Sequence, residues 1–161
     1  MTDVLTPAQR RLNMSRIRGQ DTKPEMLVRK GLHARGLRFR LHDRKLPGCP
    51  DLVFQRYRAA VFIHGCFWHG HGCALSKIPA TRQEFWLKKL GDNVDRDQRA
   101  IESLSARGWR VLIVWECALR GPGRGNKGEV IDAVASGICS GAGRLLEYAG
   151  RPAQTTTIEI E

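Results

Sequence analysis

Four possible metal ligands stand within eight residues, in the segment CFWHGHGC that begins at Cys66. A structural zinc ion takes four Cys or His ligands in a tetrahedron, and four neighbours on one short loop rarely close that shape. A distant fourth ligand is therefore expected, and Cys117 follows an apolar run further along the chain. Free thiols with surface histidines are the alternative, but this density of ligands favours a metal. The predicted zinc set is Cys66, His71, Cys73 and Cys117.

A second group of residues could carry acid–base and hard-metal chemistry. Asp51, preceded by proline, opens one short apolar run, and His64 ends the next. The Pro-Asp pair resembles the first half of the PD-(D/E)xK nuclease signature, but VFIH stands where acid-x-lysine is expected. A carboxylate, a backbone carbonyl and waters can hold Mg²⁺, and His64 or His69 can carry a proton near neutral pH. An aspartate that only caps a strand is the alternative interpretation.

Large aromatic side chains accompany these residues. Phe67 and Trp68 lie in the same Gly-rich segment, and Trp86 lies in the helical pattern that follows. Exposed aromatics of this size are typical of binding surfaces, and they can wedge between DNA bases. Core packing is the alternative, and for Trp86 the two interpretations are equally supported. Trp109 and Trp115, in an apolar run, are expected in the core.

The charge balance indicates a polyanionic partner. The 161 residues carry a formal net charge of +11, and the first 50 hold 12 basic and 4 acidic side chains. Such a surplus favours nucleic acid over a basic surface that serves only solubility. Five cysteines argue against a disulfide framework. No apolar run is long enough for a membrane span or a secretion signal, so a cytoplasmic protein is expected.

An N-terminal arm is predicted from the first helical pattern. Thr6 and Pro7 read as the cap and first residue of a helix over 7–18. Its apolar residues are too few for a core helix, so we interpret it as an arm that orders against a partner. The residues expected to press into a groove are Met14, Arg16, Ile17 and Arg18.

The remaining elements predict an α/β fold. Helices are expected over 22–36, 81–91, 94–108 and 129–138, the first and second opened by capping boxes and the first three ended by glycines. Strands are expected over 37–41, 51–54, 59–64 and 109–115, and a Gly-, His- and Cys-rich loop over 65–79. Three consecutive strands favour antiparallel pairing, and a helical crossover favours parallel pairing of the last. A mixed sheet flanked by helices follows.

Four segments resemble the very-short-patch mismatch repair endonucleases, the Vsr family: PDLVF, VFIHGCFWHGHGC, PATRQEFWLKKLGDNVDRD and GWRVLIVWECALRG. The resemblance covers residues 8–121. It implies a restriction-endonuclease-like fold and an enzyme that nicks one strand of double-stranded DNA beside a T:G mispair left by deamination of 5-methylcytosine. It also implies Mg²⁺ for hydrolysis and a structural zinc ion.

Residue by residue, the resemblance implies specific roles. Asp51 corresponds to the Mg²⁺-binding carboxylate, His64 and His69 to the catalytic histidines, and Glu25 to an assisting acid. Ile63, where family members often have threonine, can offer Mg²⁺ its backbone carbonyl. The predicted zinc set corresponds to the family's zinc ligands, and the three loop and helix aromatics, Phe67, Trp68 and Trp86, to its intercalating side chains.

The resulting organisation is a basic arm over 1–20, an endonuclease domain over 21–140 and a C-terminal tail over 141–161 that we expect to be frayed. The protein is expected to act as a monomer. Two alternatives stay open: a restriction-type endonuclease that cuts matched DNA, and a zinc-stabilised DNA-binding module without catalysis. The clustering of Asp51, His64 and His69 speaks against the second alternative.

Overall fold

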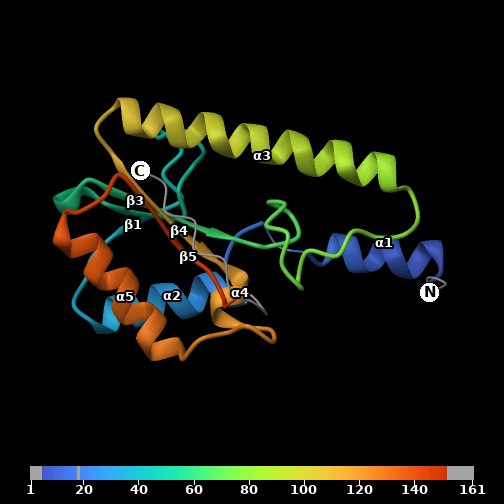
Figure 1. Cartoon of the computed structure of the whole chain (residues 1–161), viewed down its shortest axis with the longest axis horizontal. Coiled ribbons are helices and arrows are strands. Elements are labelled where there is room, and N and C mark those ends of the chain that lie inside the picture. Colours follow the sequence, from blue (N-terminus) through green and yellow to red (C-terminus); the bar gives the residue numbers. More distant parts are fainter. Residues whose placement is uncertain (1–4, 18, 152–161) are drawn as a thin grey trace.

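The structure is a computed structural model that describes residues 5–17 and 19–151. Figure 1 shows its elements, which follow the chain in this order: α1 (Pro7–Ser15), α2 (Lys23–Ala34), β1 (Arg40–Leu41), β2 (Leu52–Phe54), the short 3₁₀ helix η1 (Gln55–Tyr57), β3 (Ala59–His64), α3 (Gln83–Ala106), β4 (Arg110–Trp115), α4 (Glu116–Leu119), α5 (Lys127–Ser140) and β5 (Leu145–Tyr148). None of the helices in these described ranges is long and apolar enough to cross a membrane.

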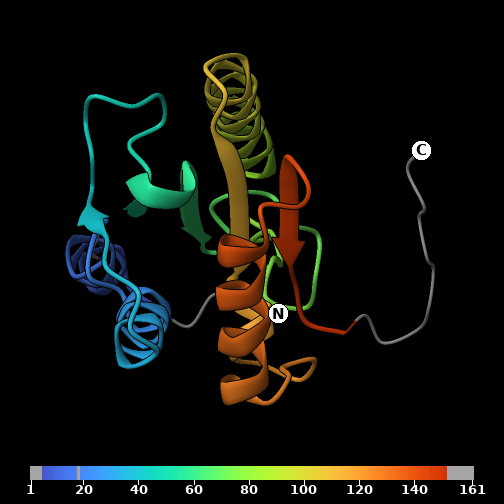
Figure 2. The same ribbon diagram turned by 90° about the vertical axis from the view of Figure 1, so that its left-hand side faces the viewer.

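The five strands form one mixed sheet in the order β1-β2-β3-β4-β5. The pairs β1–β2 and β2–β3 are antiparallel, whereas β3–β4 and β4–β5 are parallel. The predicted mixed sheet is therefore confirmed, including the parallel strand that arrives through a helical crossover. Figures 1 and 2 show α3 on one face of the sheet and α2 and α5 on the other.

The core has two layers because the central strands are buried on both faces. Alternate residues of β2, β3 and β4 pack against α2 and α5, for example Val61 and Leu112 against Leu32 and Ile138. The residues between them pack toward α3 and the loop that precedes it. Continuous apolar runs such as Arg110–Trp115 are what such doubly covered strands require.

A single helix replaces the two helices expected over 81–91 and 94–108. Gly91 lies inside the 24-residue α3 and does not end it, because an exposed helical glycine costs only about 1 kcal/mol relative to alanine. The expected capping box at Thr81 does not form either. The N-cap of α3 is Arg82, whose backbone lies in the left-handed region and whose side chain makes no capping hydrogen bond. In Figure 1 the N-terminal half of α3 extends beyond the sheet on the same side as α1.

The expected C-terminal tail begins with a strand, which corrects the sequence analysis. β5 pairs in parallel with β4 through Val111↔Leu145 to Val114↔Tyr148. Its pattern of exposed and half-buried residues is that of an edge strand, and four such residues give a weak signal. Strand 37–41 is shorter than expected, since only Arg40–Leu41 pairs. Residues 152–161 lie outside the described part of the chain.

Candidate active site and metal centre

Adjacent strand ends position the predicted acid and histidine. Asp51 immediately precedes β2, and His64 is the last residue of β3, with which β2 pairs antiparallel. Oδ2 of Asp51 accepts a hydrogen bond of 2.7 Å from the backbone N–H of Ile63. The sheet therefore fixes the carboxylate beside the residue whose carbonyl was expected to share its metal.

Asp51 is held in an environment that disfavours its charge. Burial, reinforced by the nearby Glu25 carboxylate, raises its pKa to about 6, although the Ile63 N–H and the charges of His42 and His69 oppose this change. Its other oxygen, Oδ1, lies 3.8 Å from Nδ1 of His42, beyond hydrogen-bond distance. A carboxylate of this kind gains most from a bound cation.

The two predicted histidines meet as a stacked pair. The rings of His64 and His69 are 3.8 Å apart and parallel to within 2°. His64 is buried, and burial, with the neighbouring His69, lowers its pKa to about 3. His69 is more exposed, and its Nδ1 lies 2.5 Å from Oδ2 of Asp97. His64 is therefore neutral at physiological pH, while a carboxylate orients the ring of His69 and leaves its Nε2 available.

Asp97 was missed by the sequence analysis. It lies in α3, within a stretch of charged residues that reads as a solvated helix face. Its contact with His69 depends on α3 running unbroken past Gly91, which the sequence analysis did not predict. Asp97 lies four turns into α3 and faces the loop after β3. Its role could have been recognised only if that loop had been placed against α3.

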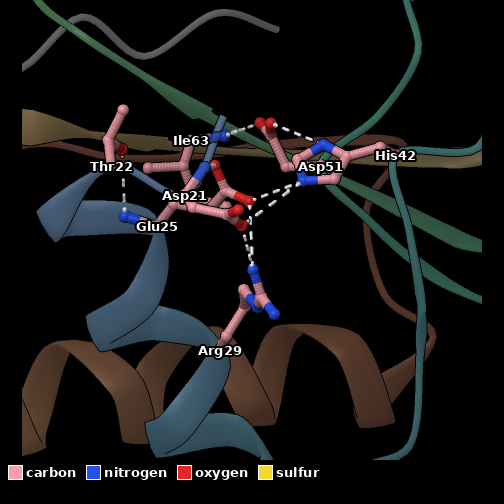
Figure 3. A network of polar contacts seen from close by, with 7 residues as sticks. All are labelled: Asp21, Thr22, Glu25, Arg29, His42, Asp51 and Ile63. Carbon is pink, nitrogen blue, oxygen red and sulfur yellow. Dashed lines mark hydrogen bonds and ion pairs between the residues drawn. The ribbon is translucent and has the colours of Figure 1, made fainter. Parts of the chain in front are cut away.

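Glu25 combines a helix-capping position with a place in the site, as Figure 3 shows. Its N–H donates to Oγ1 of Thr22, the N-cap of α2. In a capping box the Glu25 carboxylate would accept in return from the N–H of Thr22. Here its Oε2 accepts from the N–H of Asp21 instead. Only 2% of Glu25 is exposed, and its Oε1 lies 2.9 Å from Nε2 of His42, a residue that the sequence analysis also missed.

The predicted soft-metal ligands converge from two distant segments. Donor atoms of Cys66, His71, Cys73 and Cys117 lie within 4.8 Å of one another. Cys117 follows β4 at the start of α4 and brings its Sγ to 3.5 Å from Nδ1 of His71. The structure therefore has a possible Cys₃His metal site, which joins the loop after β3 to the end of β4.

Backbone donors support thiolates at this centre. The N–H of Cys117 donates to Sγ of Cys66 at 3.3 Å, and the N–H of Gly150 donates to Sγ of Cys117 at 3.2 Å. Burial raises the pKa of Cys73, but hydrogen bonds from His71, from Ser76 and from the chain outweigh it and lower that pKa to about 6. Burial instead raises the pKa of the Cys66 and Cys117 thiols. Thiolates are the form that binds metal, so a bound cation would stabilise the charged form of these two buried sulfurs, and the residues fit such an ion.

The three aromatic residues form one partly exposed cluster. The ring of Phe67 lies 5.0 Å from that of Trp68 and 5.4 Å from that of Trp86, edge to face in both cases. All three are half-buried, and the ammonium group of Lys89 lies 5.5 Å from the ring of Trp68. Trp86 therefore does not belong to the main core, whereas Trp115 is buried.

The arm supplies another wall of the same site. α1 has no buried residue, and Met14 and Ile17 are 40% and 50% exposed. Ile17 lines a cleft of about 610 Å³ together with Ile63, His69 and the loop aromatics. Arg16 is exposed, and Arg18 lies outside the described residues.

A mixed sheet with an acid and a histidine at the ends of adjacent strands, and a second histidine in the loop that follows, has the architecture of a nuclease with the restriction-endonuclease-like fold. A model of the family described as DNA mismatch endonuclease Vsr matches residues 2–75. The chain is 55% identical over 121 residues to the DNA mismatch endonuclease Vsr of Escherichia coli. The aligned segment covers 75% of this chain and 78% of that protein.

Other relatives carry names of nicking enzymes. Identity is 50% over 119 residues to the Type II nicking enzyme V.XorIIP of Xanthomonas oryzae, covering 74% of this chain and 88% of that one. It is 44% over 120 residues to the Type II nicking enzyme V.NmeAIP of Neisseria meningitidis, covering 74% and 86%. The chain belongs to the Vsr family of DNA mismatch endonucleases. It is therefore an enzyme that acts on DNA, as the resemblance implied.

Proposed function

We propose that this endonuclease nicks one strand of double-stranded DNA next to a T:G mispair that arises from deamination of 5-methylcytosine, and so starts a very short repair patch. The observation that carries the proposal is the meeting of Asp51, His64 and His69 at one end of the sheet, beside a partly exposed aromatic cluster. The names of the relatives, mismatch endonuclease and nicking enzyme, support it.

Asp51 and the backbone carbonyl of Ile63 would hold Mg²⁺. The site fits a hard cation because one oxygen of the half-buried Asp51 accepts from the Ile63 N–H, and the other has no hydrogen bond within the described part of the chain. When bound, the ion supplies Lewis-acid polarisation of the phosphate and stabilises charge on the leaving oxygen. The isoleucine side chain has no hydroxyl, so residue 63 offers only its carbonyl.

The histidines would divide the proton transfer and the support of the phosphate. His69 would take a proton from the attacking water at Nε2, because its Nδ1 is held by Asp97. His64, neutral because of its low pKa, would donate a hydrogen bond to the phosphate or its water. Glu25 would assist from the other side of Asp51 by orienting water.

The soft-metal centre would hold a structural zinc ion. Three cysteines and one histidine are a ligand set that zinc prefers, with no ligand position left for catalysis. The ion would fasten a loop that has little core of its own to the ends of β3 and β4.

Recognition of the mispair would rest on how easily the DNA deforms at that base pair. A T:G pair stacks less well than a matched pair, so wedging Phe67, Trp68 and Trp86 beside it requires less energy. The arm would enter from another side through Met14, Arg16, Ile17 and Arg18. The enzyme would act as a monomer, in the cytoplasm, where the chromosome lies.

Duplexes that differ in one base pair test this function. We expect the protein, with Mg²⁺, to nick a T:G duplex in the sequence context of a cytosine methyltransferase site, and to leave the matched C:G duplex uncut. Equal cleavage of both duplexes would favour a restriction-type enzyme. Binding without a nick in Mg²⁺, Mn²⁺ or Ca²⁺ would favour a module without catalysis.

A further inference from the structure

His42 stands between two carboxylates that come from different parts of the fold. Its Nε2 lies 2.9 Å from Oε1 of Glu25, carried by α2, and its Nδ1 lies 3.8 Å from Oδ1 of Asp51, which precedes β2 (Figure 3). At most a fifth of each of these three side chains is exposed. Oε1 of Glu25 and Nε2 of His42 are fully buried and have no aligned hydrogen bond in the described structure. Among the ion pairs of the described residues, each atom is the other's nearest partner.

The backbone at residue 42 directs the imidazole to this place. β1 ends at Leu41, and the N–H of His42 extends the β1–β2 pairing by donating to the carbonyl of Asp51 at 3.1 Å. Residue 42 itself is left-handed, with φ +46°. Residues other than glycine rarely adopt this backbone conformation, although histidine, asparagine and aspartate do so more often than most. Strained backbone of this kind is concentrated at functional sites.

The charged groups around the His42 imidazole indicate that it holds the Glu25 carboxylate near Asp51. Nη1 of Arg29 lies 2.5 Å from Oδ1 of Asp21 and 3.7 Å from Oε1 of Glu25, so it balances the acids on the helix side. The more exposed Asp21 also lies 4.0 Å from Nε2 of His42. Of the side chains in the described structure that form ion pairs with Glu25, only His42 also reaches Asp51. Without the imidazole, repulsion from Asp51 and attraction to Arg29 would both act on the Glu25 carboxylate, and the Asp21 N–H bound to Oε2 would be left to oppose its displacement from the site.

We propose that His42 is a positioning residue for the nicking reaction: it holds the Glu25 carboxylate at a fixed place beside Asp51. The inference rests on the proposed function and extends it to a residue outside the set expected to touch DNA or metal. His42 acts through the two acids, and its ring joins α2 to the end of β1 at the point where the acids must cooperate.

Three substitutions separate the two ring contacts. His42→Phe keeps a ring and removes both nitrogens, His42→Gln keeps a nitrogen near Nε2, and His42→Asn keeps one near Nδ1. We expect His42→Phe to lower the single-turnover nicking rate by about 10- to 100-fold, the range for residues that orient a site, with DNA affinity unchanged. Because the Glu25 contact is the short one, His42→Gln should recover most of the rate and His42→Asn should not.

The exposed His33, further along α2, is the matched control, and His33→Phe should nick at the parent's rate. Parental nicking by His42→Phe would overturn the proposal. So would rates of the three His42 variants that simply follow their melting temperatures, because a merely structural residue would behave in that way.

A second measurement does not depend on nicking. Urea unfolding is measured for His42→Phe, Glu25→Gln and the double variant. If the two side chains hold each other, the stability change caused by His42→Phe is smaller in the Glu25→Gln background. Additive changes would contradict the positioning role. Should the parent fail to nick any T:G duplex, the proposed function fails, while this cycle still decides whether His42 and Glu25 hold each other.

Discussion

The imidazole of His71 stacks on the indole of Trp115, with ring centroids 4.2 Å apart and planes 20° apart. The same indole meets His64 edge-on at 5.2 Å. One buried side chain at the end of β4 therefore contacts a ligand of the soft-metal centre and a member of the histidine pair. The two sites form one packed unit, and the state of the metal centre is expected to affect the arrangement of the histidines.

Loss of one metal ligand tests this connection. We expect Cys117→Ser to lower the bound zinc measured by atomic absorption, to lower the melting temperature, and to slow nicking more than the loss of folded protein explains. Cys139→Ser is the matched control, because Cys139 is an exposed free thiol at the end of α5. Unchanged zinc content in Cys117→Ser would contradict the ligand assignment.

Substitution of Asp51 tests the catalytic acid. Asp51→Asn keeps the shape and can still accept from the Ile63 N–H, but it removes the negative charge. We expect nicking to fall by at least about a hundredfold, with zinc content and the circular dichroism spectrum unchanged. A variant that nicks at the parental rate would show that the acid is elsewhere.

The raised pKa of Asp51 also predicts a pH dependence of stability. Its pKa rises from 3.8 to about 6 on folding, so its contribution to stability is fully present below pH 3.8 and is lost as the pH rises through 6. Without divalent cations, Asp51→Asn should therefore be more stable than the parent at pH 7, by on the order of 2 kcal/mol, but not at a pH below 3.8. Urea unfolding at both pH values measures this difference.

Asp97 is expected to orient His69. Asp97→Asn keeps a hydrogen-bond acceptor near Nδ1 of His69 but removes the negative charge beside the ring. We expect the nicking rate to fall about 10- to 100-fold with DNA affinity unchanged. Asp95→Asn, an exposed change two residues away in α3, should leave the rate unchanged. Equal rates for the two variants would show that His69 does not need Asp97.

The glycine inside α3 gives a prediction that concerns only stability. Gly91 is helical and exposed, and a Cβ at this position would meet no atom within 4 Å beyond its own stretch of helix backbone in the described structure. Gly91→Ala should therefore raise the free energy of unfolding by about 0.5–1 kcal/mol, because alanine loses less backbone entropy than glycine in a helix. An unfolding curve identical to the parent's would contradict the continuity of α3 at this point.

The sequence predicted the central strands and the convergence of three cysteines and a histidine because their signals are local or chemically specific. Buried strands need long apolar runs, and cysteines and histidines rarely gather on one loop unless they bind a metal. His42 and Asp97 could not be predicted, because each becomes part of the site only through a contact across the fold. β5 was missed for a related reason: its residues alternate weakly, and its place depends on the free edge of β4.

The hydrogen bond from Gly150 to the sulfur of Cys117 has a consequence for biosynthesis. A side chain at residue 150 would collide with the carbonyl of Cys117, so the segment after β5 fits closely over the centre. The first three ligands leave the ribosome long before the fourth, and the last backbone donor follows some thirty residues after that. A product that stopped before Cys117 would lack the fourth of these possible ligands, and one that stopped before Gly150 would lack the backbone donor to its sulfur.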